Sequence, residues 1–481
     1  MTGWPNAAIV ILALPAATAA LLAALPSYRL SAALNVASAL ITFLASASLL
    51  VVSPPPNAYL LVDDLNVVFI VLNTFVGFTA SAFSATYIAH EIETGRLTPA
   101  HLRFYHAMYQ FLLLSMNLAL IANNIGLMWV AIELATLTTV LMVGIYRTPA
   151  AIEAAWKYFI LGSVGIALAL FGTILVYMAA RPVVGEGVQG MLWTSLIRSV
   201  PDFDPSLLDL AFVFLLLGYG TKVGLAPLHA WLPDAHAEGP TPISAVLSGL
   251  LLNVALYAVL RFKLLLDANA RALAPGPLMA TLGLVSIVFA AFMLYRRRDV
   301  KRLFAYSSIE HMGVIVFAFG VGGPLGNFAA LLHMAMHSLT KSAIFYTVGQ
   351  IAQVKGSQQI AEIRGLTVSH PLLGWSLVFG VFAIVGLPPM GVFMSEFLIV
   401  SSTFERAPWL ALLLAFGLLV ALGALVLRLQ GMAFGAPTGS TAAAKSSALP
   451  ILAHFALVLM AGVWLPPPLV AWFQHVAEML R

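Results

Sequence analysis

The sequence predicts an all-α membrane protein with about fourteen transmembrane helices. Hydrophobic residues make up 61% of the chain and charged residues 9%, and the mean hydropathy is +0.98, a composition that excludes a soluble globular protein. The apolar runs have the length that crosses roughly 30 Å of hydrocarbon. They lack strict period-two alternation and are too long for barrel strands, so helices are expected.

Fourteen apolar runs follow one another along the 481 residues. The first run ends in small residues but lacks a basic segment before it, which favours a retained helix over the alternative, a signal peptide. Two connections are long: 181–207, expected at the outer surface, and 435–447, expected to be a flexible inner loop. The expected spans are 5–25, 30–52, 64–88, 104–122, 125–146, 152–179, 208–228, 243–265, 276–295, 303–321, 325–353, 372–400, 407–428 and 448–468.

Lysines and arginines indicate the orientation. With the N-terminus outside, thirteen of these cations fall on inner loops and seven on the outer side. This bias predicts a multi-pass protein of the cell's inner (cytoplasmic) membrane with both termini on the outer face. The three remaining cations, Lys157, Lys222 and Lys341, fall inside expected spans.

Several kinds of site lack support in the sequence. The chain has no cysteine, which excludes disulfides and cysteine-ligated iron–sulfur clusters. No glycine-rich loop follows a strand, so a bound dinucleotide or phosphate group is not expected. No basic-aromatic patch points to a nucleic-acid partner. We expect no cofactor and no metal in this chain.

The seventh and twelfth spans contain two similar glycine–proline breaks, GLAPL at 224–228 and GLPPM at 386–390. They lie five spans apart, and an odd offset reverses the direction of a helix. The breaks therefore predict two inverted five-helix repeats, spans 4–8 and 9–13. The expected parts are N-terminal helices 1–3 over 1–103, a core over 104–430 with repeats of about 104–265 and 276–430, and a loop and last helix over 431–481.

Lys222 stands beside the first break, inside an apolar run. A lysine at that depth costs about 2.5–3.5 kcal/mol on insertion scales, so we expect it to face a hydrated, protein-lined interior. Glu133 lies near the middle of the fifth span; the alternative role is packing, with a bond to Thr136. Proximity of the two groups favours both charged forms and desolvation favours both neutral forms, so a changing distance would change whether the lysine holds its proton.

His333, His337 and Lys341 recur every four residues in the eleventh span. This spacing places them on one helix face over roughly 12 Å. Three proton-exchanging groups on one face inside a membrane predict a proton path. The alternative for the histidines is haem ligation, which would require His311 of the tenth span as the facing ligand.

Three other positions belong to the candidate set. Lys157, about one turn into the sixth span, joins the path or only reaches the inner interface. Glu396 follows the second break and is either an exit group or a plain surface carboxylate. Glu310 precedes His311 in the tenth span.

The loop after the first break holds His229, Asp234 and His236. With one carboxylate available, we favour a structural loop with a role in proton uptake over the alternative, a metal site.

These residues lie in segments that resemble a known family. Residues 221–261, TKVGLAPLHAWLPDAHAEGPTPISAVLSGLLLNVALYAVLR, are similar to a signature of the antiporter-like membrane subunits of respiratory complex I. WVAIELATL, RRDVKRLFAYSSIEHMG and HMAMHSLTKSAIF are similar to other motifs of this family. The family includes the M and N subunits of NADH-quinone oxidoreductase, the D-type subunit of multisubunit Na⁺/H⁺ antiporters, and subunits of group 4 membrane-bound hydrogenases.

The resemblance implies fourteen helices, with inverted repeats and broken helices seven and twelve. It implies that Glu133 pairs with Lys222, that His333, His337 and Lys341 are the connecting residues of the eleventh helix, and that Glu396 is the exit residue of the twelfth. One position departs from the pattern: Asn253 stands where complex I subunits usually carry a central lysine. That departure, with WVAIEL and LLNVALYAVLR, is most similar to the hydrogenase-4 component F branch.

The resemblance implies a proton-translocating membrane subunit of a complex I-like or hydrogenase-4-type respiratory oxidoreductase. Electrons would move in a peripheral redox arm, hydrogenase-like or NADH dehydrogenase-like, bound beside other membrane subunits and lipid. Protons, or Na⁺, would be the transported ions, with Lys157, His229 and His311 also on the pathway. The alternative is a multisubunit Na⁺/H⁺ antiporter without electron transfer, and a third interpretation is a haem-bearing quinone enzyme.

Overall fold

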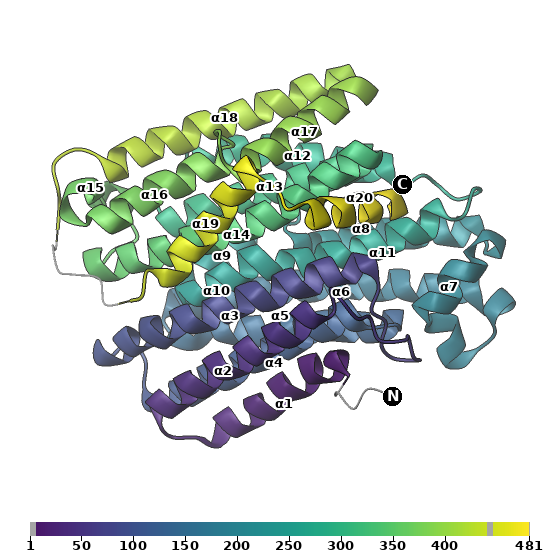
Figure 1. Ribbon diagram of the computed structural model, residues 1–481, viewed down its shortest axis with the longest axis horizontal. Coiled ribbons are helices and arrows are strands. Elements are labelled where there is room, and N and C mark those ends of the chain that lie inside the picture. The colour runs from purple at the N-terminus through teal and green to yellow at the C-terminus, as the bar shows by residue number, and fades with distance from the viewer. Residues whose placement is uncertain (1–5, 440–445, 481) are drawn as a thin grey trace. The chain divides into compact units, whose positions relative to one another are not determined.

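The computed structural model of the chain describes residues 6–439 and 446–480, and most of them are helical (Figure 1). The described residues form no β-strand, only isolated bridges such as Leu60–Ala122 and Asp299–Gln359. The predicted all-α class is therefore confirmed. Lys445, one of the thirteen cations counted on the inner loops, and Arg481, one of the seven counted on the outer side, lie outside the described residues, as does part of the loop expected at 435–447.

Among the described residues, eleven helices are long and apolar enough to cross a membrane, or twelve if the bent pair α19 (Leu449–Val463) and α20 (Pro467–Met479) forms one span. The multi-pass prediction is confirmed, but the number fourteen is not. Two expected spans, 325–353 and 372–400, are not among the helices that are long and apolar enough. Polar residues interrupt the apolar surface of α14 (Pro324–Lys355), and a break divides the other into α16 (Pro371–Ile384) and α17 (Gly391–Arg406). Both carry candidate proton-handling residues.

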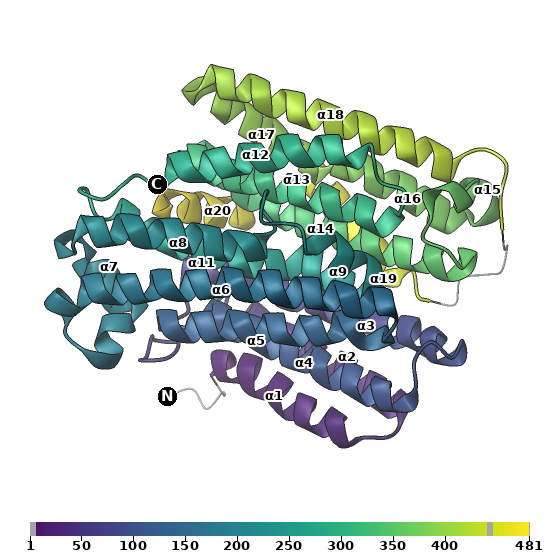
Figure 2. The ribbon, with the colours of Figure 1, turned by 180° about the vertical axis from the view of Figure 1, so that it is seen from behind.

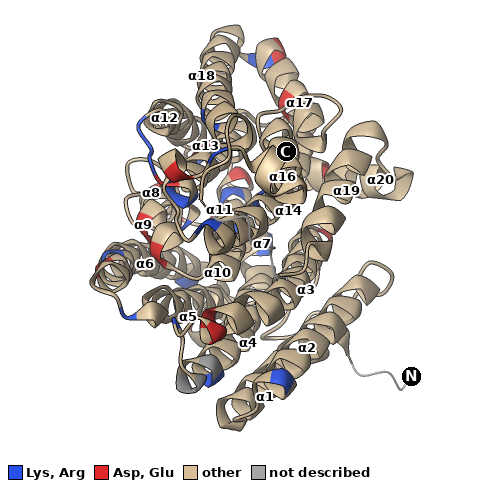
Figure 3. Ribbon diagram, turned by 90° about the vertical axis from the view of Figure 1, so that its left-hand side faces the viewer, with Lys and Arg blue, Asp and Glu red and all other residues tan. Residues whose placement is uncertain are grey.

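The described residues form two compact units. Unit 1 comprises 6–81, 95–223 and 250–275, and unit 2 comprises 82–94, 224–249 and the described residues from 276 onward. Helix α3 (Asp64–Glu93) contributes to both units. Figure 3 shows how sparsely Lys, Arg, Asp and Glu are distributed over the ribbon, as expected for helices whose outer faces contact lipid.

Unit 1 is a layered bundle in which sequence neighbours pack together. Helix α1 lies beside α2 and α4, α5 lies between α4 and α6, and α6 runs along α8 (Figures 1 and 2). The expected outer connection at 181–207 contains the short helix α7. The helices are α1 (Ala7–Ala24), α2 (Tyr28–Ser48), α4 (Pro99–Ile121), α5 (Ile125–Val143), α6 (Pro149–Val184), α7 (Trp193–Ser199), α8 (Pro205–Val223) and α11 (Leu252–Asp267).

Unit 2 is organised around α14, which packs against α10, α13, α16, α17, α19 and α20 (Figure 1). This position buries every side of the middle of α14. The other helices are α9 (Leu232–Glu238), α10 (Thr241–Val246), α12 (Gly276–Leu294), α13 (Val300–Val321), α15 (Leu366–Ser369) and α18 (Pro408–Ala433).

Side-chain caps explain where several helices begin. Asn124 accepts hydrogen bonds from the backbone of Gly126 at 2.9 Å and Leu127 at 3.0 Å at the start of α5. Thr148 caps α6 through the amide of Ala151 at 3.1 Å, and Asp299 caps α13 in the same way. Each oxygen satisfies a donor that the first helical turn leaves unpaired.

Two glycines allow α8 to lie tightly against α6. A Cβ atom on Gly165 would lie 2.7 Å from the Thr221 Cβ atom, and one on Gly218 would lie 2.6 Å from the Gly165 carbonyl oxygen. The C-terminal end of α8, which carries Lys222, is therefore held directly against α6.

Both helix breaks lie where the sequence predicts them. Helix α8 ends at Val223, one residue after Lys222, and α16 ends at Ile384 before the second motif. Gly224 has a φ of 82° and Gly386 a φ of 67°, a left-handed conformation that glycine adopts without steric cost. The inverted-repeat relation between the two segments stays a prediction.

Candidate functional site

The candidate residues gather in two clusters, one in each unit. The lysine cluster in unit 1 consists of Glu133, Thr136, Tyr158, Gly162 and Lys222. The histidine cluster in unit 2 consists of Glu310, His311, His333, His337, Lys341, Ser395 and Glu396.

Lys222 is almost fully enclosed, with 1% of its side chain exposed. Its Nζ atom donates a hydrogen bond to Thr136 Oγ1 at 2.8 Å and lies 5.8 Å from the centre of the Tyr158 ring. The Thr136 hydroxyl itself donates to the Ile132 carbonyl oxygen at 3.0 Å, so the threonine oxygen is left to accept from the ammonium. Neutral oxygen and aromatic partners thus surround the charge on α5 and α6.

Glu133 faces the ammonium without touching it. Its Oε2 atom lies 3.8 Å from Lys222 Nζ, and 18% of the side chain is exposed. The same oxygen has no hydrogen-bond partner among the described residues. The energy of a charge pair in protein surroundings changes steeply with separation, so a small movement of this carboxylate changes the stability of the ammonium.

The space for the Lys222 ammonium comes from Gly162 on α6. A Cβ atom on this residue would lie 2.8 Å from Lys222 Nζ and 3.4 Å from Thr136 Cγ2. Any larger residue would push the ammonium away from its oxygen partners. Gly162 is therefore a positioning residue, and the sequence pattern does not single it out.

The histidine cluster joins three helices, α13, α14 and α17, through His333. The Nε2 atom of His333 lies 3.0 Å from His311 Nδ1, and its Nδ1 atom lies 2.9 Å from Ser395 Oγ. His311 also lies between two carboxylates. Its Nε2 atom is 3.4 Å from Glu310 Oε2 and its Nδ1 atom 3.9 Å from Glu396 Oε1.

This geometry does not fit haem ligation by His311 and His333. Two nitrogens on opposite faces of a haem iron would be about 4 Å apart, twice a metal–nitrogen bond of ~2 Å. The two rings are instead in direct contact, with their centres 5.2 Å apart and an angle of 24° between their planes. No porphyrin fits between them.

His333, His337 and Lys341 form a stripe along one face of α14, and the other two members, His337 and Lys341, are fully buried. Lys341 donates from Nζ to the Phe304 carbonyl oxygen at 3.0 Å and lies 5.6 Å from that ring's centre. Neither ring nitrogen of His337 has a hydrogen-bond partner among the described residues, and the same holds for the hydroxyls of Thr340 and Ser342. Buried polar groups of this kind are usually satisfied by internal water, so the stripe can hold a hydrated path.

Glu396 lies inside the fold, with 11% of its side chain exposed. The second break holds it there, because its carboxylate lies directly against the Cα position of Gly386. A side chain on Gly386 would collide with this carboxylate. The break thus positions Glu396 beside His311 and does more than end a helix.

Lys157 is not brought to Lys222. It forms an ion pair with Glu153 at 2.6 Å on a face of α6 where 47% and 66% of the two side chains are exposed. Asn253 is buried beside Asn73 and Phe69 at a cavity of about 10 Å³, which is the space of about one water molecule.

The loop after the first break does not gather metal ligands. His229 packs between the rings of Phe289 and Tyr306. His236 stacks on Phe345 with the ring centres 4.7 Å apart, and Asp234 pairs with Arg302 at 3.1 Å. These contacts favour the structural interpretation of the loop.

Lys157, Lys222 and Lys341 lie in helices as expected, but three further cations expected on the loops and surfaces, Arg261, Lys263 and Lys301, are also buried. Arg261 pairs with Asp63 at 2.7 Å and Lys263 with Asp267 at 2.6 Å. Lys301 donates to the carbonyl oxygens of Ala237 and Gly239 at the C-terminal end of α9. The four-residue spacing of Lys263 and Asp267 was a usable signal. The partners of Arg261 and Lys301 lie about 200 and 60 residues away.

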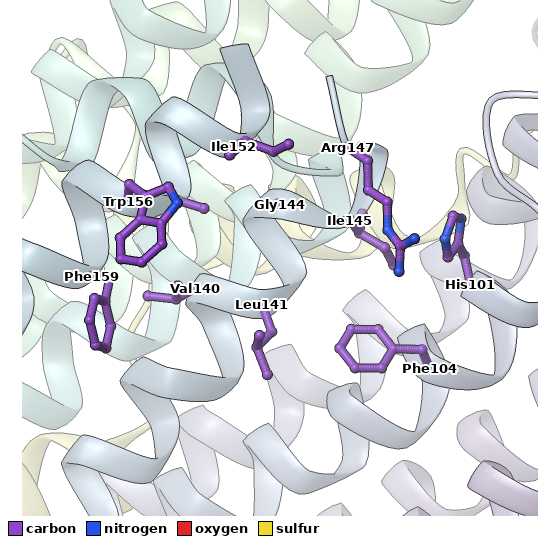
Figure 4. A pocket seen from close by; sticks show the side chains of 11 residues that line it. His101, Phe104, Val140, Leu141, Gly144, Ile145, Arg147, Ile152, Trp156 and Phe159 are labelled. Atoms are coloured by element: carbon purple, nitrogen blue, oxygen red, sulfur yellow. The ribbon is translucent and has the colours of Figure 1, made fainter. Parts of the chain in front are cut away.

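A larger cavity, of about 710 Å³, lies elsewhere in unit 1 (Figure 4). Aromatic and aliphatic side chains line most of it, including Phe104, Trp156 and Phe159, and two basic side chains, His101 and Arg147, lie at one side. It contains no member of either cluster. The candidate site therefore consists of buried side chains and not of an open ligand pocket.

The sequence matches the family described as NADH:quinone oxidoreductase/Mrp antiporter, transmembrane, over residues 122–423. A protein described as a hydrogenase-4 component F homolog, from Methylacidiphilum infernorum, is 62% identical over 476 residues, which cover 99% of this chain and 100% of that protein. The expected family resemblance is confirmed.

Solved structures share the fold. A chain of the membrane-bound sulfane sulfur reductase, an archaeal respiratory membrane complex, has a TM-score of 0.88 at 24% identity, covering 99% of this chain and 98% of that one. A chain of the Mrp complex from Dietzia sp. has a TM-score of 0.85 at 17% identity, with the same coverage. At these identities the likeness concerns the fold alone.

The contact between Gly162 and Lys222 predicts strong coupling of their substitutions. Gly162→Ala destabilises the protein because its methyl group displaces the ammonium, but in a Lys222→Ala background the same methyl group enters vacated space. Thermal unfolding of the purified chain in detergent should show a coupling free energy of about 0.5–3 kcal/mol between the two substitutions.

Gly431→Ala is the matched control, since no atom lies within 4 Å of a Cβ there. Its effect should add to that of Lys222→Ala. Additive effects for Gly162→Ala as well would contradict the proposed positioning role.

Proposed function

We propose that the chain, which belongs to the NADH:quinone oxidoreductase/Mrp antiporter family, translocates protons as a membrane subunit of a complex I-like or hydrogenase-4-type respiratory oxidoreductase. One observation carries the proposal. A buried lysine, Lys222, stands at a helix break 3.8 Å from the carboxylate of Glu133, close enough for strong interaction and too far for a direct hydrogen bond.

Lys222 takes up and releases the proton in this proposal. When Glu133 approaches, its negative charge stabilises the ammonium and a proton binds to the amine. When Glu133 withdraws, desolvation favours the neutral amine and the proton leaves. Thr136 keeps the Nζ atom in place in both states, because its hydroxyl oxygen accepts a hydrogen bond from the ammonium and equally from an N–H of the neutral amine.

The histidine cluster acts in series with the lysine cluster. An imidazole can accept a proton on one nitrogen and release a different proton from its second nitrogen. His333 has one nitrogen toward His311 and its second nitrogen toward Ser395. Lys341 lies two turns farther along α14 and delivers protons through the hydrated stripe at His337. Glu396, at the exposed side of the cluster, is the exit group.

Asn253 does not take part as a proton carrier, since a carboxamide does not titrate. The adjoining cavity has room for about one water molecule. We propose that protons pass this position through water.

Electron transfer takes place in partner subunits, which also hold the redox cofactors. The free energy of that reaction reaches this chain as a movement of Glu133 relative to Lys222. The protein acts in the cell's inner membrane with both termini on the outer face, beside other membrane subunits and a redox arm that is hydrogenase-like or NADH dehydrogenase-like. The similarity to the hydrogenase-4 component F homolog supports this assignment.

A subunit of a multisubunit Na⁺/H⁺ antiporter is the second candidate. The fold shared with a chain of the Mrp complex favours it, and the same proton-exchanging groups would serve such an exchanger. The two candidates differ in their partners.

Lys222→Ala should abolish proton translocation while the complex still assembles. The change removes the titrating group, and membrane vesicles energised by the native electron donor should show no internal pH change with a pH-sensitive dye. Lys157→Ala is the matched control. Its ion pair lies on the exposed face of α6, so it should retain transport close to that of the unmodified protein.

Unchanged proton movement in the Lys222→Ala variant would refute the mechanism. Loss of transport in both variants, with both complexes intact, would mean that the exposed face of α6 also carries protons.

Co-purification should separate the two candidates. We expect an affinity-tagged chain in mild detergent to bring down a peripheral arm with a nickel–iron hydrogenase-like or flavin/iron–sulfur subunit. Recovery of small hydrophobic subunits alone, from membranes that exchange Na⁺ for H⁺, would support the antiporter instead.

A further inference from the structure

We propose that His311, His333 and Glu396 form a binding site for a divalent first-row metal ion of the Zn²⁺ type, and that the bound metal blocks the proton path. The sequence predicts no metal in this chain, so the site emerges from the three-dimensional arrangement. Its existence does not depend on the function proposed above, whereas the blocking effect does.

The three residues bring one ligand atom each to a common point. The ligand atoms lie within 4.8 Å of one another, with 3.0 Å between the two imidazole nitrogens and 3.9 Å from His311 Nδ1 to Glu396 Oε1. Tetrahedral coordination with bonds of about 2.0–2.1 Å separates two ligand atoms by roughly 3.3 Å. The observed distances lie on both sides of this value, so small side-chain rotations suffice.

Neighbouring groups direct the lone pairs of both imidazoles toward this point. The Ser395 hydroxyl donates to the Val392 carbonyl oxygen at 2.8 Å, so its oxygen accepts from His333 Nδ1. The lone pair of His333 is then on Nε2. Glu310 Oε2 lies 3.4 Å from His311 Nε2; with the hydrogen of His311 on that nitrogen, its lone pair is on Nδ1.

Two lone pairs therefore face each other at 3.0 Å, with the carboxylate of Glu396 alongside. In these tautomers the two lone pairs need a positive charge or a hydrogen between the nitrogens. A single proton satisfies this need, and so does a divalent metal ion, which also draws the carboxylate in. Imidazole and carboxylate ligands suit Zn²⁺ and related ions.

The groups around the two imidazoles are of the kind that surround metal-ligating histidines in zinc sites. Ser395 bonds to the outer nitrogen of His333 at 2.9 Å and Glu310 lies 3.4 Å from that of His311; partners at these positions orient metal-ligating imidazoles. Three protein ligands leave a fourth position for water. A second observation is independent of the ligand distances. His337 is fully buried, both of its ring nitrogens lack a partner among the described residues, and its ring centre lies 5.5 Å from that of His311. A water on the metal would give His337 a partner.

Metal binding and proton transfer exclude each other at this site. A metal ion occupies the lone pairs of His311 and His333 that would carry the proton, and it fixes Glu396 in one position. If Glu396 is the exit group, occupancy of the site stops transport after the proton has reached α14.

The test titrates the purified full-length chain in detergent, freed of metal with a chelator, with Zn²⁺ by calorimetry and with Co²⁺ by visible absorption. We expect one equivalent bound with the intense d–d bands of four-coordinate Co²⁺. His333→Gln should lose that equivalent and those bands, and Ser395→Ala should weaken binding about 10- to 100-fold. His454→Gln is the matched control, since His454 is buried in the same unit and bonds to the Leu339 carbonyl oxygen.

Glu396→Gln provides a second readout if His333→Gln fails to fold. Zn²⁺ should raise the unfolding temperature of the unmodified chain, and Glu396→Gln should lose most of that rise. Two outcomes would overturn the site: no saturable binding, which means that a shared proton alone lies between the histidines, or the same binding in His333→Gln, which means that other histidines of the chain hold the metal.

The blocking effect is tested in the same vesicles as proton transport. Zn²⁺ at its dissociation constant should halve proton movement, saturating Zn²⁺ should stop it, and a chelator should restore it. Binding without inhibition would overturn the blocking effect. Absence of proton transport before metal is added would count against the proposed function and leave the binding result intact.

Discussion

A protonated lysine inside an apolar bundle needs oxygen atoms around it, and this requirement explains much of unit 1. Desolvation of an ammonium costs several kcal/mol unless partners replace its water. Thr136 supplies a hydroxyl oxygen, Glu133 supplies a negative charge, and Gly162 leaves the space. The glycine-mediated approach of α6 and α8 and the end of α8 at Val223 bring these groups together.

The two clusters combine the same elements in different ways. In each unit a glycine with a positive φ angle follows the end of a helix, and a titratable side chain lies close by: Lys222 before Gly224, and Glu396 against Gly386. In unit 1 the partner is one carboxylate at a distance that movement can change. In unit 2 the partners are imidazoles in direct contact, whose protonation can change while the backbone stays in place.

Some features follow from the sequence because they depend on local spacing. Three such features are a lysine beside Gly-x-x-Pro, a glutamate in an apolar run, and three titratable residues spaced four apart. Each is a polar group in an apolar segment, so each predicts that the fold supplies it with polar partners. Contacts between distant segments do not follow in this way. The pairing of Arg261 with Asp63 and the contact of His311 with His333 depend on how helices face each other. Lys157 shows the same limit, because α6 is apolar all round and its sequence does not reveal which face is exposed.

In the proposed mechanism Lys222 carries a proton that it can give up. Lys222→Arg separates this role from that of a fixed charge, because arginine keeps the positive charge and its attraction to Glu133 but does not release its proton. The measurement is proton translocation by vesicles that contain the assembled variant complex. We expect an intact complex with transport abolished. Transport at the level of the unmodified protein would show that a fixed charge is sufficient at this position and that Lys222 is not a proton carrier.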